Sequence, residues 1–242
     1  VFGNPSSLHR AGLDAELLVS DAREAIADAL GVTPDEVYFT SGATESNNTA
    51  IFGAYKAHGK RKKRVVISSV EHPAVKNPAQ ELEDMGCEVI RISPDENGEI
   101  NARDIFAAVN EDTFLVSCML VNNENGYILP VEKAFSMIKK KYPQVLTHCD
   151  CVQGFMKIPV KAKKLNADMI SLSGHKIYAP KGIGALYVKK GVHIPPFMLG
   201  GGQEKGFRSG TESVPLICGF GAAVKKLAPN VSANFEKAAD IQ

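Results

Sequence analysis

Short hydrophobic runs alternate with helical patterns along most of this chain, and this alternation constrains the fold more than any other feature. Apolar residues recur at helical spacing over 13–30, and further helical patterns cover 48–58, 73–85, 101–110 and 130–141. Strands are expected at residues 36–40, 65–68, 87–92, 113–120, 145–149, 168–172 and 182–188. Because strand–helix–strand units form parallel sheets with helices on both faces, we predict an α/β fold, a three-layer αβα sandwich around a mostly parallel sheet.

The 242 residues contain no internal repeat and no linker, so a single domain over 1–242 is expected. Residues 1–12 form a turn-rich arm without a starting methionine, and a last helix, from about Val214, is expected to continue to Gln242. Both ends suggest a piece of a longer protein.

Composition argues against several classes of function. The formal net charge is +1, which gives no reason to expect nucleic acid or a membrane surface as a partner, and the basic run 60–64 is typical of a solvated connection. No apolar run is long enough to span a bilayer. Five scattered cysteines, an odd number in a chain that needs no disulfides, favour a reducing, cytoplasmic setting.

The stretch 168–177 reads as a buried strand followed by a small-residue turn that presents His175 and Lys176 at the strand's carboxyl end. Open α/β sheets bind their ligands at this edge. A lysine held against a sheet can be desolvated, which favours the neutral amine that forms a Schiff base with a carbonyl compound. The alternative is a solvated lysine at a strand end.

A second candidate feature is the loop 41–46, which joins a short strand to a helix. The exposed N–H groups at such a helix start can bind an anion, and the Thr44 hydroxyl could contribute. In the alternative reading, Thr44 or Ser41 is a plain N-cap of the helix.

Three more polar residues follow predicted strands. His72 lies in a strand-to-helix loop, Asn123 lies among amides that are either turn formers or ligand contacts, and Asp150 ends a strand. Pyridoxal phosphate requires a lysine for its aldehyde, a carboxylate for its pyridine nitrogen and a phosphate site at a helix start. Lys176, Asp150 and Thr44 supply these three elements.

An ordered series of motifs then extends over essentially the whole chain. It comprises residues 3–7, 40–46, 71–72, 122–124, 150–153, 173–176, 180–182 and 208–211. The series resembles the motifs of the cysteine desulfurases, which are class V aminotransferase-like, fold-type I pyridoxal phosphate enzymes. The resemblance implies that residues 1–242 are the large, cofactor-binding domain, with the helix from 214 leading to a small domain that is absent.

The resemblance also implies roles for individual residues. Lys176 would bind the cofactor and move the substrate's α-proton, with His72 stacking on the ring and assisting proton transfer. Asp150 would pair with the ring nitrogen, and Gln153 and Asn123 would bond the ring oxygen or the substrate.

The same resemblance implies a phosphate site and a homodimer. Ala43, Thr44, Ser173 and His175 would surround the phosphate, and Thr211 would reach the phosphate of the other subunit. The substrate would be L-cysteine, converted to L-alanine, with sulfur passed as a persulfide to an acceptor or scaffold protein for iron–sulfur cluster or thio-cofactor assembly. Another class V enzyme, such as a selenocysteine lyase or an aminotransferase, or a non-catalytic remnant, are the alternatives.

The cysteines depart from the family pattern. The sulfur nucleophile of these enzymes lies on a loop of the small domain, outside this chain, and none of the five cysteines matches it by motif. Cys151 stands where the family usually has alanine. Cys149 and Cys151 are expected to share one face of a strand with Asp150 on the other, where they act as small buried residues; a metal site with His148 is the weaker alternative.

Overall fold

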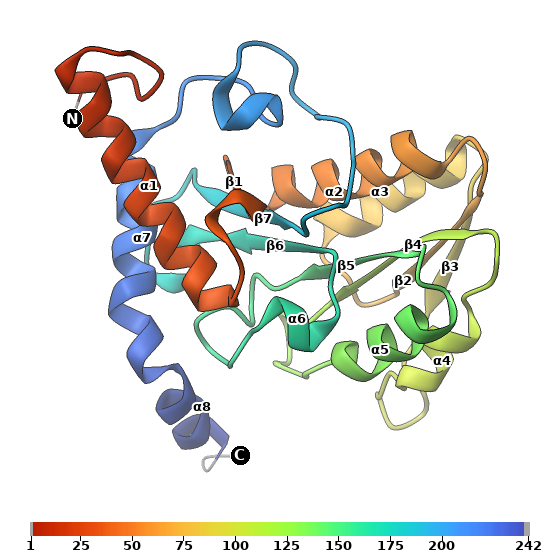
Figure 1. The fold of residues 1–242 in the computed structure, drawn as a ribbon. Helices are drawn as coiled ribbons and strands as arrows, with labels where there is room; N and C mark the ends of the chain where they lie inside the picture. Colours follow the sequence, from red (N-terminus) through yellow and green to blue (C-terminus); the bar gives the residue numbers. More distant parts are fainter. Residues whose placement is uncertain (1, 240–242) are drawn as a thin grey trace.

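The computed structural model describes residues 2–239 and contains one seven-stranded sheet in the order β1-β7-β6-β5-β4-β2-β3 (Figure 1). The strands are β1 (Val37–Thr40), β2 (Arg64–Ser68), β3 (Glu88–Ile92), β4 (Thr113–Met119), β5 (Leu146–Asp150), β6 (Met169–Ser173) and β7 (Gly184–Val188). β7 is antiparallel to both of its neighbours, β1 and β6, and the other four pairings are parallel. The predicted α/β class and mostly parallel sheet are confirmed.

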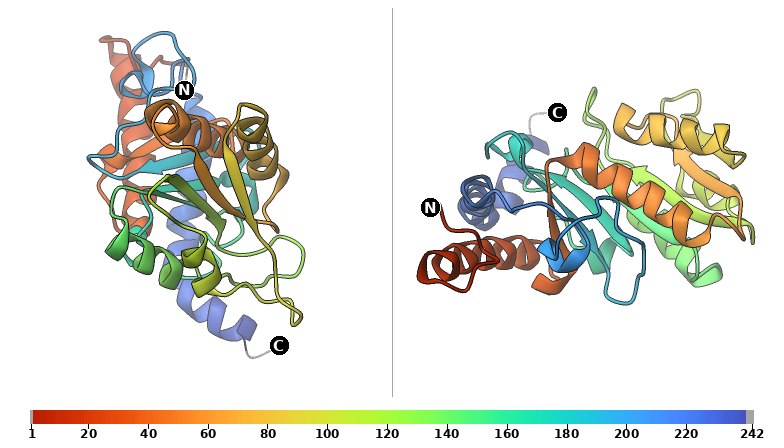
Figure 2. Two further views of the ribbon diagram at one scale, coloured as in Figure 1. Left: turned by 90° about the vertical axis from the view of Figure 1, so that its right-hand side faces the viewer. Right: turned by 90° about the horizontal axis from the view of Figure 1, so that it is seen from above.

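Helices cover both faces of the sheet (Figure 2). They are α1 (Arg10–Leu30), α2 (Ala43–His58), α3 (Pro73–Asp84), α4 (Ala102–Ala107), α5 (Val131–Lys141), α6 (Ala162–Leu165), α7 (Val214–Leu227) and α8 (Val231–Ala239). α2 and α3 share one hydrophobic core with the sheet, while α1, α4, α5, α6 and α7 share the other. Among these described helices, none is both long and apolar enough to cross a membrane.

The central strands are buried on both faces because successive side chains point into different cores. Val65 and Ile67 of β2 belong to the core under α2 and α3, whereas Val66 between them belongs to the opposite core. The same division separates Leu115 from Val116 in β4. Each strand thus stabilises both layers, and each fully buried aliphatic side chain contributes on the order of 2 kcal/mol.

Three helix boundaries differ from the sequence-based expectation. α1 begins at Arg10, where Nδ1 of His9 accepts a 3.1 Å hydrogen bond from the N–H of Gly12, so the N-terminal arm ends before residue 12. α2 begins at Ala43, five residues earlier than predicted. The helix expected from Val214 to the end is interrupted at Ala228–Asn230, where Pro229 breaks the helical hydrogen bonding; its last residues, 240–242, lie outside the described part.

The loop between β7 and α7 is anchored to the sheet by a buried carboxylate. Glu204 accepts hydrogen bonds of 2.7 and 2.8 Å from the guanidinium of Arg23 in α1 and one of 2.9 Å from the N–H of Phe39 in β1. The backbone is left-handed at Glu204 and Lys205. The carboxylate therefore fixes a strained turn in the segment that leads to Arg208 and Thr211.

Candidate functional site

The carboxyl ends of five strands open onto one cavity of about 540 Å³. β1, β2, β4, β5 and β6 end at this edge, and β7 begins there because it runs in the opposite direction. Nine of the ten predicted site residues line the cavity: Ala43, Thr44, His72, Asn123, Asp150, Gln153, Ser173, His175 and Lys176. Thr211 does not; it is exposed in the loop before α7.

Asp150 provides the buried carboxyl group of the cavity. Its Oδ2 accepts a 2.7 Å hydrogen bond from Nδ2 of Asn47, and its Oδ1 accepts a 3.0 Å bond from the N–H of Val152. Burial raises the pKa of Asp150, while these two hydrogen bonds and, in its protonated form, the nearby His72 act in the opposite direction. Asn47 is a functional candidate that the sequence did not reveal, because a contact between residues 103 positions apart has no local signal.

Lys176 lies in a 3₁₀ turn, Gly174–Ile177, directly after β6. Position 174 is tight, since a Cβ there would lie 2.8 Å from Cγ2 of Ile183 and would force that side chain to shift. The side chain of Lys176 lines the cavity but is exposed. This exposure agrees with the alternative of a solvated lysine at a strand end, because the turn carries Lys176 beyond the sheet edge.

The start of α2 lines one end of the cavity and has free backbone N–H groups. Its N-cap is Gly42, with no side-chain cap, so the alternative reading of Thr44 or Ser41 as a plain N-cap is wrong. Glu45 instead accepts a 2.8 Å hydrogen bond from the N–H of Ser41 and pairs with Arg208 at 2.8 Å. Within residues 2–239, the N–H groups of Ala43 and Thr44 have no acceptor.

Two histidines lie at the cavity in defined orientations. Nδ1 of His72 accepts a 3.1 Å hydrogen bond from the N–H of Ala74, so the neutral ring carries its proton on Nε2. Nδ1 of His175 lies 2.8 Å from Oγ of Ser173. Desolvation, followed by the charges of Lys176 and Lys181, lowers the pKa of His175, which favours the neutral ring.

The amide side chains divide into cavity-lining and structural groups. Oδ1 of Asn122 accepts hydrogen bonds from the N–H groups of Glu124 and Asn125, at 2.9 and 3.2 Å, so Asn122 is a turn former. Asn123 lines the cavity instead. Oε1 of Gln153 accepts a 2.6 Å bond from Nζ of Lys157, so the Nε2 donor is the group that Gln153 can offer a ligand.

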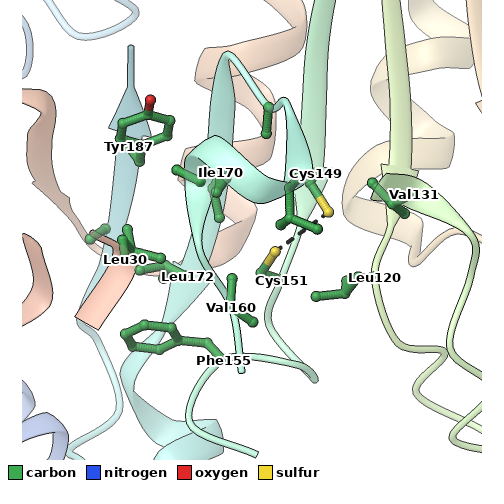
Figure 3. Packing of buried hydrophobic residues seen from close by; sticks show 14 of the residues in the cluster. Leu30, Leu120, Val131, Cys149, Cys151, Phe155, Val160, Ile170, Leu172 and Tyr187 are labelled. Atoms are coloured by element: carbon green, nitrogen blue, oxygen red, sulfur yellow. Dashed lines mark hydrogen bonds between the residues drawn. The ribbon is translucent and has the colours of Figure 1, made fainter. Parts of the chain in front are cut away.

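Cys149 of β5 and Cys151, the residue directly after this strand, lie on the face of the sheet opposite to Asp150, as expected. Their sulfur atoms are 3.4 Å apart, and both side chains are fully buried among apolar residues such as Leu120 and Val160 (Figure 3). The alternative metal site with His148 is wrong, because the ring nitrogens of His148 face Ser117 and Ser171 at 2.8 and 2.9 Å. The part of the chain that the structure describes contains no cluster of three or more metal-ligating side chains.

The donor set of the cavity fits pyridoxal phosphate. An amine at Lys176 can react with an aldehyde, a buried carboxylate at Asp150 can pair with a protonated ring nitrogen, and the free N–H groups of Ala43 and Thr44 can bind a phosphate. The apolar side chains of Val152 and Ile183 complete the walls. The volume is within the range of roughly 300–1,000 Å³ found for small-molecule sites.

Comparison with known proteins agrees with this geometry. A family model described as aminotransferase class-V matches residues 1–240. The chain is 47% identical over 228 residues to a "NifS/IcsS protein homolog" of Lactobacillus delbrueckii subsp. bulgaricus, covering 94% of this chain and 59% of that protein. It is 44% identical to "Cysteine desulfurase IscS" of Dictyoglomus turgidum over 224 residues, 93% of this chain and 56% of the relative.

Solved structures give the same result. A "NIFS-LIKE PROTEIN" superposes with a TM-score of 0.92 at 42% identity, over 95% of this chain and 63% of that one. "SspA in complex with cysteine" superposes with a TM-score of 0.90 at 41% identity, over 93% of this chain and 65% of that one. The chain thus spans less than two thirds of the length of these relatives.

Proposed function

Because the chain belongs to the class-V aminotransferase family, we propose that it is the large domain of a pyridoxal phosphate-dependent cysteine desulfurase. The full-length protein would convert L-cysteine to L-alanine and deliver the sulfur as a persulfide for iron–sulfur cluster or thio-cofactor assembly. The named relatives include a cysteine desulfurase, and one similar structure was solved in complex with cysteine. The observation that carries the proposal is the cavity itself, which joins Lys176 and Asp150 across two strand ends.

The predicted site residues divide the chemistry between them in this proposal. Bound pyridoxal phosphate supplies an electron sink for the electron pair left at the substrate's α-carbon. Asp150 would keep a proton on the ring nitrogen, and Lys176 would bind the cofactor and move the α-proton. His72 would stack on the ring and assist proton transfer through its Nε2, while Gln153 and Asn123 would hydrogen-bond the ring oxygen or the substrate.

The phosphate would be bound at the start of α2. The N–H groups of Ala43 and Thr44, the Thr44 hydroxyl, Ser173 and His175 provide the donors there. Thr211 is exposed and lies away from this cavity, in keeping with the proposal that it reaches the phosphate of the partner in a homodimer.

The sulfur nucleophile is proposed to lie outside this chain, on a small domain reached through α7 and α8. A nucleophilic cysteine must be accessible as the thiolate. All five cysteines are free, but four are buried, and burial raises the pKa of Cys118 and of Cys149. Free thiols also support the proposed cytoplasmic location. An acceptor or scaffold protein would receive the sulfur.

The test is an absorption titration of the chain with pyridoxal phosphate. We expect a new visible absorption band from cofactor bound to Lys176, and its loss in Lys176→Ala. Lys181→Ala removes the other lysine of the cavity and is expected to keep the band. A folded wild-type protein that gives no band contradicts the proposed cofactor, whereas alanine formation from cysteine by the full-length protein separates a desulfurase from an aminotransferase or a remnant.

A further inference from the structure

Asn47 is a fully buried residue of α2 that lines the cavity, and its amide is used on one side only. Nδ2 donates the 2.7 Å hydrogen bond to Oδ2 of Asp150, whereas Oδ1 is buried without a partner among residues 2–239. Buried amides usually satisfy both ends. The unpaired Oδ1 therefore indicates that the side chain is placed for its contact with Asp150, at the expense of its own hydrogen bonding.

The contact completes the environment of the Asp150 carboxylate. One oxygen accepts from Asn47 on the helix that covers the sheet, and the other accepts from the N–H of Val152 in the loop after β5. Two donors on two different elements fix both the plane of the carboxylate and its direction into the cavity. Both donors also favour the ionised carboxylate over the neutral acid.

We propose that Asn47 is a positioning residue, which keeps the Asp150 carboxylate ionised and aligned for the pyridine nitrogen of the cofactor. This inference rests on the proposed function of the cavity. Asn47 itself acts through Asp150.

The surrounding charges show why a donor matters at this point. Burial raises the pKa of Asp150, and the hydrogen bonds from Val152 and Asn47 and the charge of His72 offset that increase. Two further groups bear on the carboxylate: Lys176, which lines the same cavity, and the buried carboxyl of Glu71, which repels negative charge when ionised. Cys149 precedes Asp150 on the strand and is a thiol whose pKa burial raises. Without the hydrogen bond from Asn47, less would offset the increase that burial causes in the pKa of Asp150.

The first test follows the ¹³C resonance of the Asp150 carboxyl during a pH titration of the ligand-free protein, assigned with Asp150→Asn. In Asn47→Leu, which keeps a similar volume without a donor, we expect the titration midpoint to move to higher pH. Asn47→Asp keeps the shape and adds a like charge, so a larger shift in the same direction is expected. Asn48→Leu is the matched control, because Nδ2 of Asn48 bonds the carbonyl oxygen of Thr44 at 2.8 Å instead.

An unchanged midpoint in a folded Asn47 variant would overturn the proposal. Circular dichroism monitors the folding of Asn47→Leu and Asn47→Asp. If one of these variants misfolds, the other still tests the proposal. A shift of equal size in Asn48→Leu would also overturn it, because the effect would then belong to α2 as a whole.

The second test measures the affinity for pyridoxine 5′-phosphate, which lacks the aldehyde and so reports on binding without reaction at Lys176. Affinity is expected to weaken about tenfold for each pH unit below the Asp150 midpoint, because a protonated pyridine requires an ionised partner. In Asn47→Leu this loss is expected to begin at higher pH. Wild-type protein that fails to bind the compound contradicts the proposed function, while the carboxyl titration still decides the role of Asn47. If both proteins bind the compound and their affinities depend on pH in the same way, the role of Asn47 is contradicted but the proposed function is not.

Discussion

Oε1 of Glu71 accepts a 2.7 Å hydrogen bond from the backbone N–H of Met119, which ties the loop after β2 to the end of β4. The hydroxyl of Ser68 bonds the same oxygen, and Oε2 is buried without a partner within the described residues. Burial raises the pKa of Glu71 to about 8. A neutral carboxylic acid therefore supports the loop that carries His72.

Replacing Glu71 with glutamine is expected to make stability less dependent on pH. The folded protein holds the Glu71 proton up to a pKa of about 8, against 4.5 for the unfolded chain, so this group's stabilisation is complete below pH 4.5 and is lost as pH rises to about 8. One pKa unit corresponds to about 1.4 kcal/mol. Between pH 4.5 and about pH 8, the free energy of unfolding of Glu71→Gln should therefore rise by at most about 5 kcal/mol relative to that of wild type.

Urea unfolding of both proteins between pH 5 and pH 8 measures this difference. Glu96→Gln, which neutralises an exposed glutamate, is the control. Parallel pH profiles for wild type and Glu71→Gln would show that Glu71 is ionised in the folded state.

His148 is expected to make stability depend on pH in the opposite direction, so that stability falls as the pH falls. Burial lowers the pKa of His148 to about 3, against 6.5 in the unfolded chain, so the unfolded state binds more protons in between. Stability from this group is complete above pH 6.5 and falls as the pH drops toward 3, by about 2 kcal/mol between pH 6.5 and pH 5. His148→Gln should lose stability at pH 7, but that deficit should shrink by about this amount at pH 5. Urea unfolding of both proteins at pH 7 and pH 5 measures this change. A stability deficit of His148→Gln that is the same at both pH values contradicts the prediction.

Removing the guanidinium of Arg23 is expected to destabilise the protein by about 3–5 kcal/mol, the usual cost of leaving a buried charge without its partner. The side chain of Glu204 is only 1% exposed and would lose its cationic partner in Arg23→Met. Glu204→Gln removes the carboxylate, so the double variant should be less destabilised than the sum of the two single variants. Urea unfolding of the four proteins of this cycle measures the coupling; strict additivity would mean that the ion pair has no net effect.

Gly184→Ala tests the close approach between β7 and the loop before α2. A Cβ at Gly184 would lie 2.6 Å from the carbonyl oxygen of Leu172 and 2.7 Å from Cα of Gly42, and both of these are backbone atoms. We expect a loss of about 1–3 kcal/mol and weaker binding of pyridoxal phosphate, because Gly42 precedes the N–H groups of the phosphate site. Gly202→Ala, where a Cβ would meet nothing within 4 Å, is expected to change stability by less than about 0.5 kcal/mol. Thermal unfolding and cofactor titration compare the two.

Local sequence patterns predicted the strands and most helices because burial on both faces requires continuous apolar runs such as Val65–Ile67. The site was predictable from position as far as residues stand at strand ends, which is how Asp150 and Lys176 were predicted, whereas Ser173 was implied by the family resemblance. Asn47 was missed because its role depends on a helix packed across the sheet. Whether Lys176 is desolvated or solvated stayed open for a related reason, since the turn after β6 decides its exposure.

The rate at which a reagent labels the thiols of Cys149 and Cys151 measures how often this domain opens. They lie on either side of Asp150 in sequence but are fully buried on the opposite face of the sheet, so a thiol reagent can reach them only when the sheet opens. Cys218, half-buried on α7, provides an internal reference for reaction without such opening. The labelling rate of the buried pair therefore reports how strongly any molecule bound in the cavity holds the central strands closed.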